Sequence, residues 1–205
     1  MSQDPRQKTW ELAQVDIDEA LSFAKGIQDH WYRCQSLAKV AWHVKPKAKF
    51  IKIVNEALNT AREMPEPNRI VSCSAWVVRA MAQRDDTDIL SVVKELLQII
   101  GREPNPVRQA DALLLLFEAI YRKRELRAVV LTPLLKACEA VRSWKQPRIL
   151  SNIALILAED DLPAADNVIQ KIQQESVRRK ANEAIQKREW LGAHEFFQYY
   201  AKNVN

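Results

Sequence analysis

One short pattern recurs four times along this chain of 205 residues. In each copy, the end of an apolar helical segment is followed by a polar or proline-bearing turn, an arginine, and a second apolar helical segment. The four arginines are Arg33, Arg69, Arg108 and Arg148, at separations of 36, 39 and 40 residues. A repeat of that length holds a helix, a turn, a second helix and a return turn, and such hairpins stack into a helical solenoid.

The apolar pattern keeps the same register in all four copies. Small or apolar residues stand five and eight positions after each arginine: Ala38 and Ala41, Ser74 and Val77, Leu113 and Leu116, Ile153 and Ile156. Residues three apart lie on one face of a helix, so these pairs predict the buried face of each second helix. The spacing also predicts helices over about 16–26, 49–63, 89–100, 107–122 and 126–141, with Asp16 as the N-cap of the first. The segment 107–122 is apolar on most sides, which is typical of a central, buried helix.

The composition excludes several fold classes. Only three glycines occur, whereas β-rich and Rossmann-type folds use many in turns and phosphate loops. The longest apolar run, near 112–117, is far too short to span a membrane, and the N-terminus lacks an apolar signal region. Three widely spaced cysteines, Cys34, Cys73 and Cys138, are interpreted as reduced core thiols of a cytoplasmic protein. The net charge of +5 is only mildly basic.

We therefore expect an all-α, right-handed α/α superhelix of about five helix-turn-helix repeats, with ten or eleven helices and no strand. No linker rich in glycine or serine divides the chain, which predicts one domain over 1–205 with a repeat core over about 16–188. The fifth repeat departs from the pattern, because counting from Arg178 puts Glu183 and Gln186 at the two apolar positions. This repeat and a last helix over about 189–203 are expected to form the capping end that solenoids need.

The repeat resembles a known class. Ala20, Ala24 and Ile27, a polar turn, and then Arg33, Leu37 and Ala41 follow the form A-x₃-A-x₂-I, turn, R-x₃-L-x₃-A of bacterial helical repeats. The segment 57–64 followed by Arg69 is similar, and the likeness covers about residues 16–160. The chain thus resembles the TPR-like and HEAT-like α/α-superhelix class. That resemblance implies a scaffold that binds other macromolecules, of a class whose members seldom carry catalysis.

The repeat arginines and two neighbouring tryptophans are the candidate partner-binding residues: Arg33, Arg69, Arg108, Arg148, Trp31 and Trp144. In one interpretation the arginines form a ladder of cations that holds phosphate or carboxylate groups. In the other, each pairs with a carboxylate of its own or the adjacent repeat, or bonds the last carbonyls of the preceding helix. Trp31 and Trp144 are expected in the turn that joins the first helix of a repeat to the second. There an aromatic ring beside an arginine could stack on a nucleic-acid base or pack between repeats.

The return turns alternate in charge. Segments 45–49, 122–124 and 187–188 are basic, whereas 85–88 and 159–161 are acidic. All of them should lie along the edge opposite the repeat arginines. Alternating signs interrupt any continuous basic stripe, which argues against duplex DNA along that edge. The pattern suits ion pairing with a protein partner, or solubility alone.

Sequence motifs of enzymes are absent. The chain has no Walker loop, no G-x-S-x-G and no H-E-x-x-H, and its three histidines are scattered. We therefore expect no catalytic residues, no cofactor and no metal site. The leading hypothesis is a non-enzymatic scaffold whose concave face, lined by second helices, binds a protein or peptide. The alternative is a nucleic-acid-binding or HEAT-like DNA-repair protein. A groove of mixed polar and apolar character would favour the first, and a basic cluster with exposed tryptophan and a single carboxylate the second.

Overall fold

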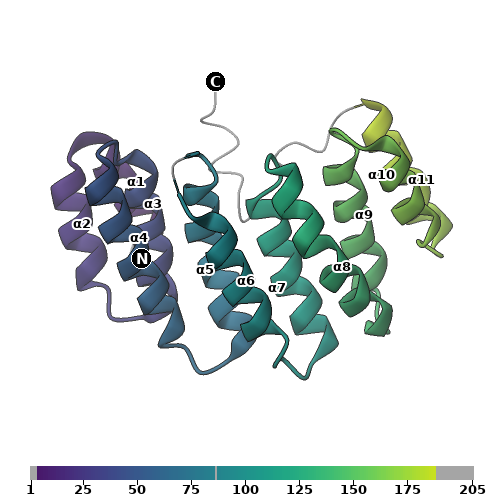
Figure 1. The fold of residues 1–205 in the computed structure, drawn as a ribbon, viewed down its shortest axis with the longest axis horizontal. Coiled ribbons are helices and arrows are strands. Elements are labelled where there is room, and N and C mark those ends of the chain that lie inside the picture. Colours follow the sequence, from purple (N-terminus) through teal and green to yellow (C-terminus); the bar gives the residue numbers. More distant parts are fainter. Residues whose placement is uncertain (1–3, 86, 188–205) are drawn as a thin grey trace. The chain divides into compact units, whose positions relative to one another are not determined.

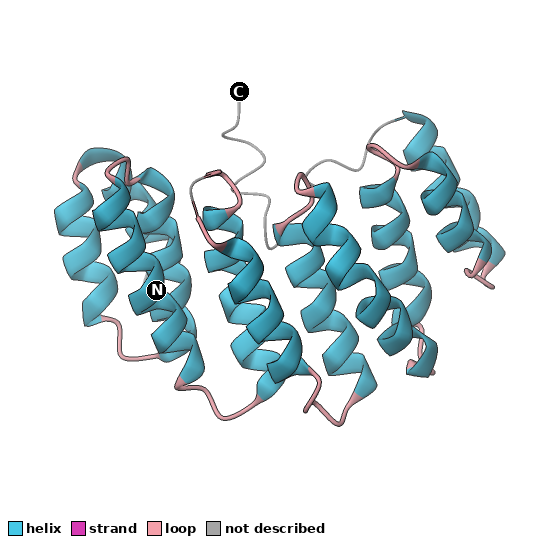
Figure 2. Ribbon diagram, viewed as in Figure 1, coloured by secondary structure: helices cyan, strands magenta, loops and turns pink. Residues whose placement is uncertain are grey.

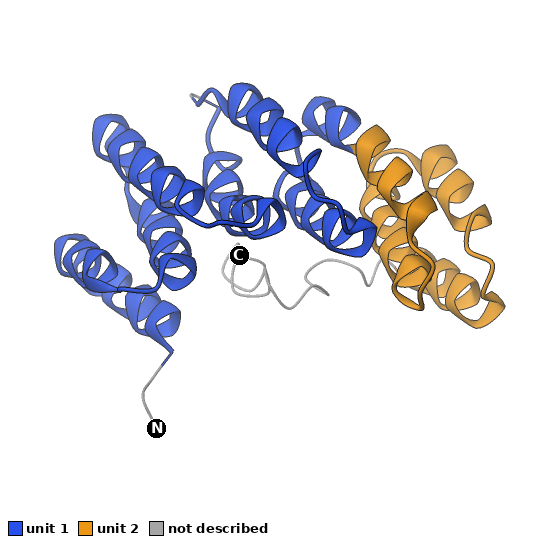
Figure 3. Cartoon of the chain, turned by 90° about the horizontal axis from the view of Figure 1, so that it is seen from below, with its two compact units in different colours: residues 1–130 blue, residues 131–205 orange. Residues whose placement is uncertain are grey.

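The computed structural model describes residues 4–85 and 87–187, and these residues form α-helices and connecting turns with no strand (Figures 1 and 2). The chain folds into two compact units, residues 1–130 and 131–205, each of which is described by itself (Figure 3). The described residues hold eleven helices: α1 (Pro5–Val15), α2 (Ile17–Gly26), α3 (His30–His43), α4 (Lys47–Arg62), α5 (Pro67–Met81), α6 (Ile89–Ile100), α7 (Pro106–Ala119), α8 (Arg124–Ala140), α9 (Lys145–Leu157), α10 (Leu162–Gln170) and α11 (Glu175–Lys187). The all-α prediction is confirmed for this part of the chain.

Polar caps set the helix starts. The Asp16 carboxylate accepts hydrogen bonds from the backbone N–H groups of Asp18 (2.8 Å) and Glu19 (3.0 Å), as predicted for α2. Asp29, Asp88, Asn105 and Asp161 cap α3, α6, α7 and α10 with their side chains. The helix α6, which Asp88 caps, has its predicted bounds. The helix α4 has no side-chain cap and begins two residues earlier than predicted.

Two predicted features need correction. The second helices begin before the repeat arginines, which are therefore the third or fourth residue of α3, α5, α7 and α9 instead of turn residues. Trp31 also lies inside α3, because Asp29 caps that helix upstream of both side chains. The helix α1 was not predicted at all. Asp4 caps it and Pro5 opens it, but only Thr9, Trp10 and Ala13 are buried, which is too few for a clear apolar period.

The helices of unit 1 form two layers. The helices α1, α3, α5 and α7 pack side by side in one layer, and α2, α4 and α6 pack against it. Small residues allow close approach at the α3–α5 contact, where the Cys34 thiol donates to the Cys73 carbonyl (3.7 Å) and the Cys73 thiol to the Trp31 carbonyl (3.4 Å). Ion pairs join the second layer: Lys25 with Glu56 (2.9 Å) and Arg62 with Glu95 (2.8 Å).

The core follows the predicted register. All eight residues at the fifth and eighth positions after the arginines are at most 2% exposed. The helix α7 buries every residue from Ala112 to Ala119, which confirms the buried helix expected there. The three cysteines are buried thiols, also as expected.

Unit 2 holds the end of α8 together with α9, α10 and α11. The helix α9 packs against α10 and α11, and its Ile153 and Ile156 are buried with Val168 and Ile169 of α10. The helix α8 includes Pro133 and does not end there, although an internal proline removes one backbone donor and crowds the preceding turn. The predicted capping helix over 189–203 lies outside the described residues. In the part of the chain that the structure describes, no helix is long and apolar enough to cross a membrane.

Candidate functional site

The four repeat arginines do not share one environment. Arg33 donates from Nη2 to the Gln28 carbonyl (3.1 Å), just after the end of α2. Arg69 pairs with Glu66 of the same helix turn (3.7 Å), and its guanidinium lies 5.7 Å from the centre of the Trp31 ring. These two arginines make the local contacts that a structural role requires, and Arg69 and Trp31 are the only predicted candidates that the described contacts bring together.

Arg108 and Arg148 differ from the first two. Both are exposed, and their side chains make no hydrogen bond, ion pair or ring contact with any described residue. The four arginines therefore differ in their contacts with the described residues, and their role in binding a partner stays a prediction.

The charged return turns of unit 1 pair with one another. Lys123 of the turn after α7 pairs with Asp85 of the turn after α5. Arg84 donates from Nη1 to the carbonyls of Val44 (3.3 Å) and Lys45 (3.1 Å), in the turn after α3. The charged turns, whose alternating signs were interpreted as suited to a protein partner or to solubility, thus make contacts that link successive repeats of unit 1.

A buried cation lies between aromatic rings in the first layer of unit 1. Lys39 of α3 is 2% exposed, and its Nζ is 5.7 Å from the centre of the Trp10 ring and 5.9 Å from that of Trp76. Its ammonium also donates to the Arg6 carbonyl (3.3 Å). Burial, with a smaller contribution from the Arg6 charge, lowers the pKa of Lys39 to about 8. Sequence reasoning missed Lys39 because a lone lysine in an apolar helix is indistinguishable from a surface residue.

Further polar groups lie in the same layer of helices. The His43 ring packs edge-on against Trp10 at 4.6 Å between centroids, and burial lowers the pKa of His43. Arg6 donates to the Gln35 side-chain oxygen (3.1 Å), and Gln35 is fully buried. The Arg79 guanidinium lies 4.3 Å from the Tyr121 ring centre and is 4% exposed as a residue. Gln35 and Arg79 are buried and Arg6, His43 and Tyr121 are half-buried, so these groups contribute mainly contacts between the helices of the first layer.

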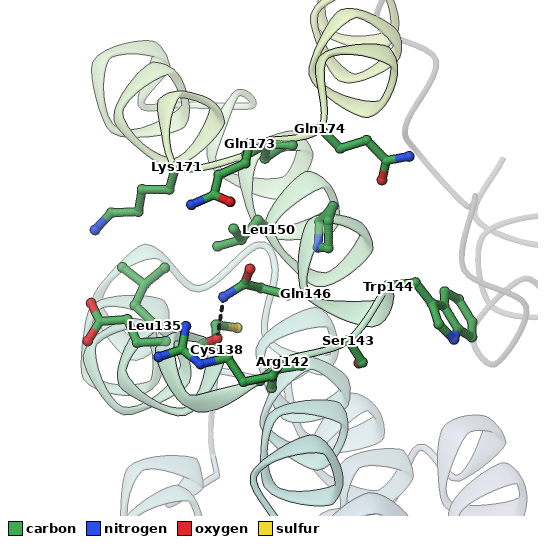
Figure 4. Close-up of a pocket in the computed structure, with 14 residues that line it drawn as sticks. Leu135, Cys138, Arg142, Ser143, Trp144, Gln146, Leu150, Lys171, Gln173 and Gln174 are labelled. Carbon is green, nitrogen blue, oxygen red and sulfur yellow. Dashed lines mark hydrogen bonds between the residues drawn. The ribbon is translucent and has the colours of Figure 1, made fainter.

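An open hollow of about 660 Å³ lies within unit 2 (Figure 4). The end of α8, the α8–α9 turn, the start of α9 and the α10–α11 turn form its walls. Its lining consists of Leu135, Cys138, Glu139, Val141, Arg142, Ser143, Trp144, Gln146, Pro147, Leu150, Lys171, Ile172, Gln173 and Gln174. Volumes of this size are typical of ligand pockets.

Local folding signals place the polar groups around the hollow. Val141 and Ile172 are buried and anchor the two turns, so the neighbouring Arg142, Lys171 and Gln173 stay exposed. Gln146 donates from Nε2 to the Cys138 carbonyl at the end of α8 (2.8 Å), which fixes its orientation. Figure 4 shows Arg142, Gln146 and Gln173 pointing toward a common space beside Leu135 and Leu150.

The charged side chains of the hollow have no partner among the described residues. The side chains of Arg142, Lys171 and Glu139 make no ion pair or hydrogen bond with any residue that the structure describes. Two cations and one carboxylate leave the lining with a net charge of +1. The walls can therefore accept an anionic group beside an apolar one.

Trp144 is the predicted candidate that adjoins this hollow. It stands immediately before α9, is 70% exposed, and extends from the rim away from Arg142 and Gln173 (Figure 4). Arg148, one turn further along α9, does not line the hollow. The other lining residues carry no sequence motif, since the hollow depends on how two turns far apart in the chain approach each other.

No group of three or more metal-ligating side chains lies together among the described residues. Comparisons of the chain with models of protein families, with curated proteins and with solved structures find no match.

Proposed function

We propose that the chain is a non-enzymatic, right-handed helical-repeat scaffold of the TPR-like or HEAT-like kind that binds a protein or peptide partner in the cytoplasm. The observation that carries this proposal is the open hollow of unit 2 with exposed Trp144 at its rim. Repeat scaffolds bind partners through surfaces built from successive turns and helices, and the hollow is built in that way.

The chemistry of the hollow suits a peptide. A peptide presents backbone donors and acceptors together with side chains of mixed character. The walls offer amide groups of Gln146 and Gln173, apolar groups of Leu135 and Leu150, and charges. Tryptophan and arginine are the residue types most enriched in the energetic centres of protein interfaces. Trp144 and Arg142 therefore make this surface a good candidate for such a centre.

The nucleic-acid alternative is supported less well. Single-stranded binders combine a continuous basic groove with exposed stacking rings. In unit 1, by contrast, Arg33 and Arg69 make local contacts and the described return turns offset one another's charge. The hollow does have the exposed tryptophan and single carboxylate named for the alternative, but its leucines and glutamines give it the mixed polar and apolar character that favours a peptide.

A peptide-display selection tests the proposal. The full chain should enrich peptides from a random library, and Trp144→Ala should weaken their binding at least fivefold because a large exposed ring is lost. Leu162→Ala is the matched control, since Leu162 is a 54% exposed apolar residue of the same unit outside the hollow. Failure to enrich any peptide, or equal binding by the two variants, contradicts the proposal. Salt-sensitive binding of single-stranded nucleic acid, weakened by Trp144→Ala, would favour the alternative.

A further inference from the structure

We infer that the hollow of unit 2 recognises an acidic peptide segment, in which an aspartate or glutamate carboxylate is held by Arg142 and Lys171 and a neighbouring apolar side chain lies on Leu135 and Leu150. This inference rests on the proposed function, which it narrows to one class of ligand. It is carried by the charge, convergence and composition of the lining.

The lining of the hollow contains two cations, which are complementary to an acidic ligand. Arg142 follows the end of α8 and Lys171 follows the end of α10, so two separate elements bring like charges to one hollow. Neither cation has an ion-pair partner among the described residues, although salt bridges are made at many other positions of this chain. Two cations in one lining favour an anion as the ligand, because an anion that binds there is attracted by both charges. Guanidinium groups also bind carboxylates through two parallel hydrogen bonds.

The single carboxylate of the lining limits the size of the anion. Glu139 lies on the last turn of α8 and makes no ion pair with a described residue. Its negative charge would oppose a polyanion that covered the whole hollow more strongly than a ligand that carries a single carboxylate. The lining is thus better matched to an acidic side chain than to a nucleic-acid backbone, which carries a charge at every nucleotide.

The remaining walls fit the rest of a peptide. The Gln146 amide nitrogen is committed to the Cys138 carbonyl, which leaves the side-chain oxygen of Gln146 to accept a backbone N–H. The Gln173 amide points into the same space and can both donate and accept. Leu135 and Leu150 supply an apolar surface next to these polar groups. The expected motif is therefore an acidic residue next to a large apolar one.

A pair of synthetic peptides tests the inference on the full chain. One is a fluorescein-labelled nonapeptide of alternating leucine and glutamate, and in the other every glutamate is glutamine. Fluorescence anisotropy should show that the glutamate peptide binds at least tenfold more tightly, and that added salt weakens its binding. Arg142→Gln and Lys171→Met should each weaken the glutamate peptide about tenfold and leave the glutamine peptide unchanged.

Matched variants separate this effect from general surface charge. Arg148→Gln removes an exposed, unpaired cation of the same unit that does not line the hollow, so it should leave the affinity unchanged. Glu139→Gln should strengthen binding of the glutamate peptide, because it removes the opposing charge. Circular dichroism of each variant checks that the fold is kept.

The outcomes are distinguishable. Equal affinity for the two peptides, no binding of the glutamate peptide, or equal losses from Arg142→Gln and Arg148→Gln would overturn the inference. If library peptides still bind and depend on Trp144, the proposed function stands while the acidic specificity fails. If no library peptide binds, the proposed function fails as well. Tighter binding of an oligonucleotide than of the glutamate peptide, lost in Arg142→Gln, would assign the hollow to nucleic acid.

Discussion

The most unusual single residue of unit 1 is Lys39. A buried ammonium group loses its hydration, and the contacts with two tryptophan rings and the Arg6 carbonyl offset that loss only in part. The pKa of about 8, against an ordinary value of 10.5, expresses the remaining cost. Lys39 therefore fixes how α1, α3 and α5 fit together at the expense of stability.

Replacement of Lys39 by methionine should stabilise the protein at pH 7 by about 2 kcal/mol, because the cost of charge burial exceeds the value of the cation–aromatic contacts. The lowered pKa sets the sign: the unfolded chain binds this proton more tightly, so the wild-type stability rises as the pH increases from about 8 to 10.5. In Lys39→Met that rise should disappear. Urea melts at pH 7 and pH 10 measure both effects.

Lys52→Met is the control for this prediction, since Lys52 is exposed on α4 and its replacement should change the stability by less than about 0.5 kcal/mol. A destabilised Lys39→Met variant at pH 7 would mean that the cation–aromatic contacts outweigh desolvation.

At the scale of elements, the sequence predicts a helix well where caps and apolar period agree. Asp88 and the run of apolar residues up to Ile100 predict α6 residue by residue. The helix α1 has a cap and an N-terminal proline but buries only three residues, so tertiary packing of Trp10 decides that it forms. The hollow could not be predicted, because its lining comes from the α8–α9 and α10–α11 turns, which are far apart in the sequence, whereas Trp144 was named as a candidate from its place in a repeat.

If Trp10 anchors α1, then Trp10→Ala should destabilise unit 1 by about 3–5 kcal/mol, the usual cost of deleting a buried large aromatic side chain. Trp10 is 4% exposed and contacts both His43 and Lys39. Denaturant melts measure the loss, and hydrogen exchange should show that protection falls first in α1. Val15→Ala, at a 90% exposed position of the same helix, serves as the control. A loss below about 1 kcal/mol would mean that α1 contributes little to the fold.

At the scale of the whole chain, stability should be distributed between neighbouring repeats, since residues contact mainly their own and adjacent hairpins. The sequence predicted one domain over 1–205, whereas the contacts define two compact units at 1–130 and 131–205. How cooperatively these units unfold is a measurable property of the molecule.

Leu116→Ala tests this cooperativity. Leu116 is fully buried in α7 of unit 1, and its truncation should cost about 2–5 kcal/mol. Because repeats are coupled only to their neighbours, urea unfolding followed by circular dichroism should then separate into two transitions, with unit 1 unfolding first. Ile156→Ala, at a 2% exposed position of unit 2, should reverse the order. A single transition in both variants would instead support the one-domain prediction.

The buried cysteines give each unit a built-in reporter of opening. Cys34 and Cys73 lie between α3 and α5 in unit 1, and Cys138 is 1% exposed in unit 2. Burial raises the pKa of Cys73, and only the thiolate reacts with alkylating reagents, so a closed unit resists modification. Timed alkylation followed by peptide mass spectrometry would therefore record how often each unit opens under native conditions, without any introduced label. The natural sequence thus already contains the probes needed to rank the local stability of its two units.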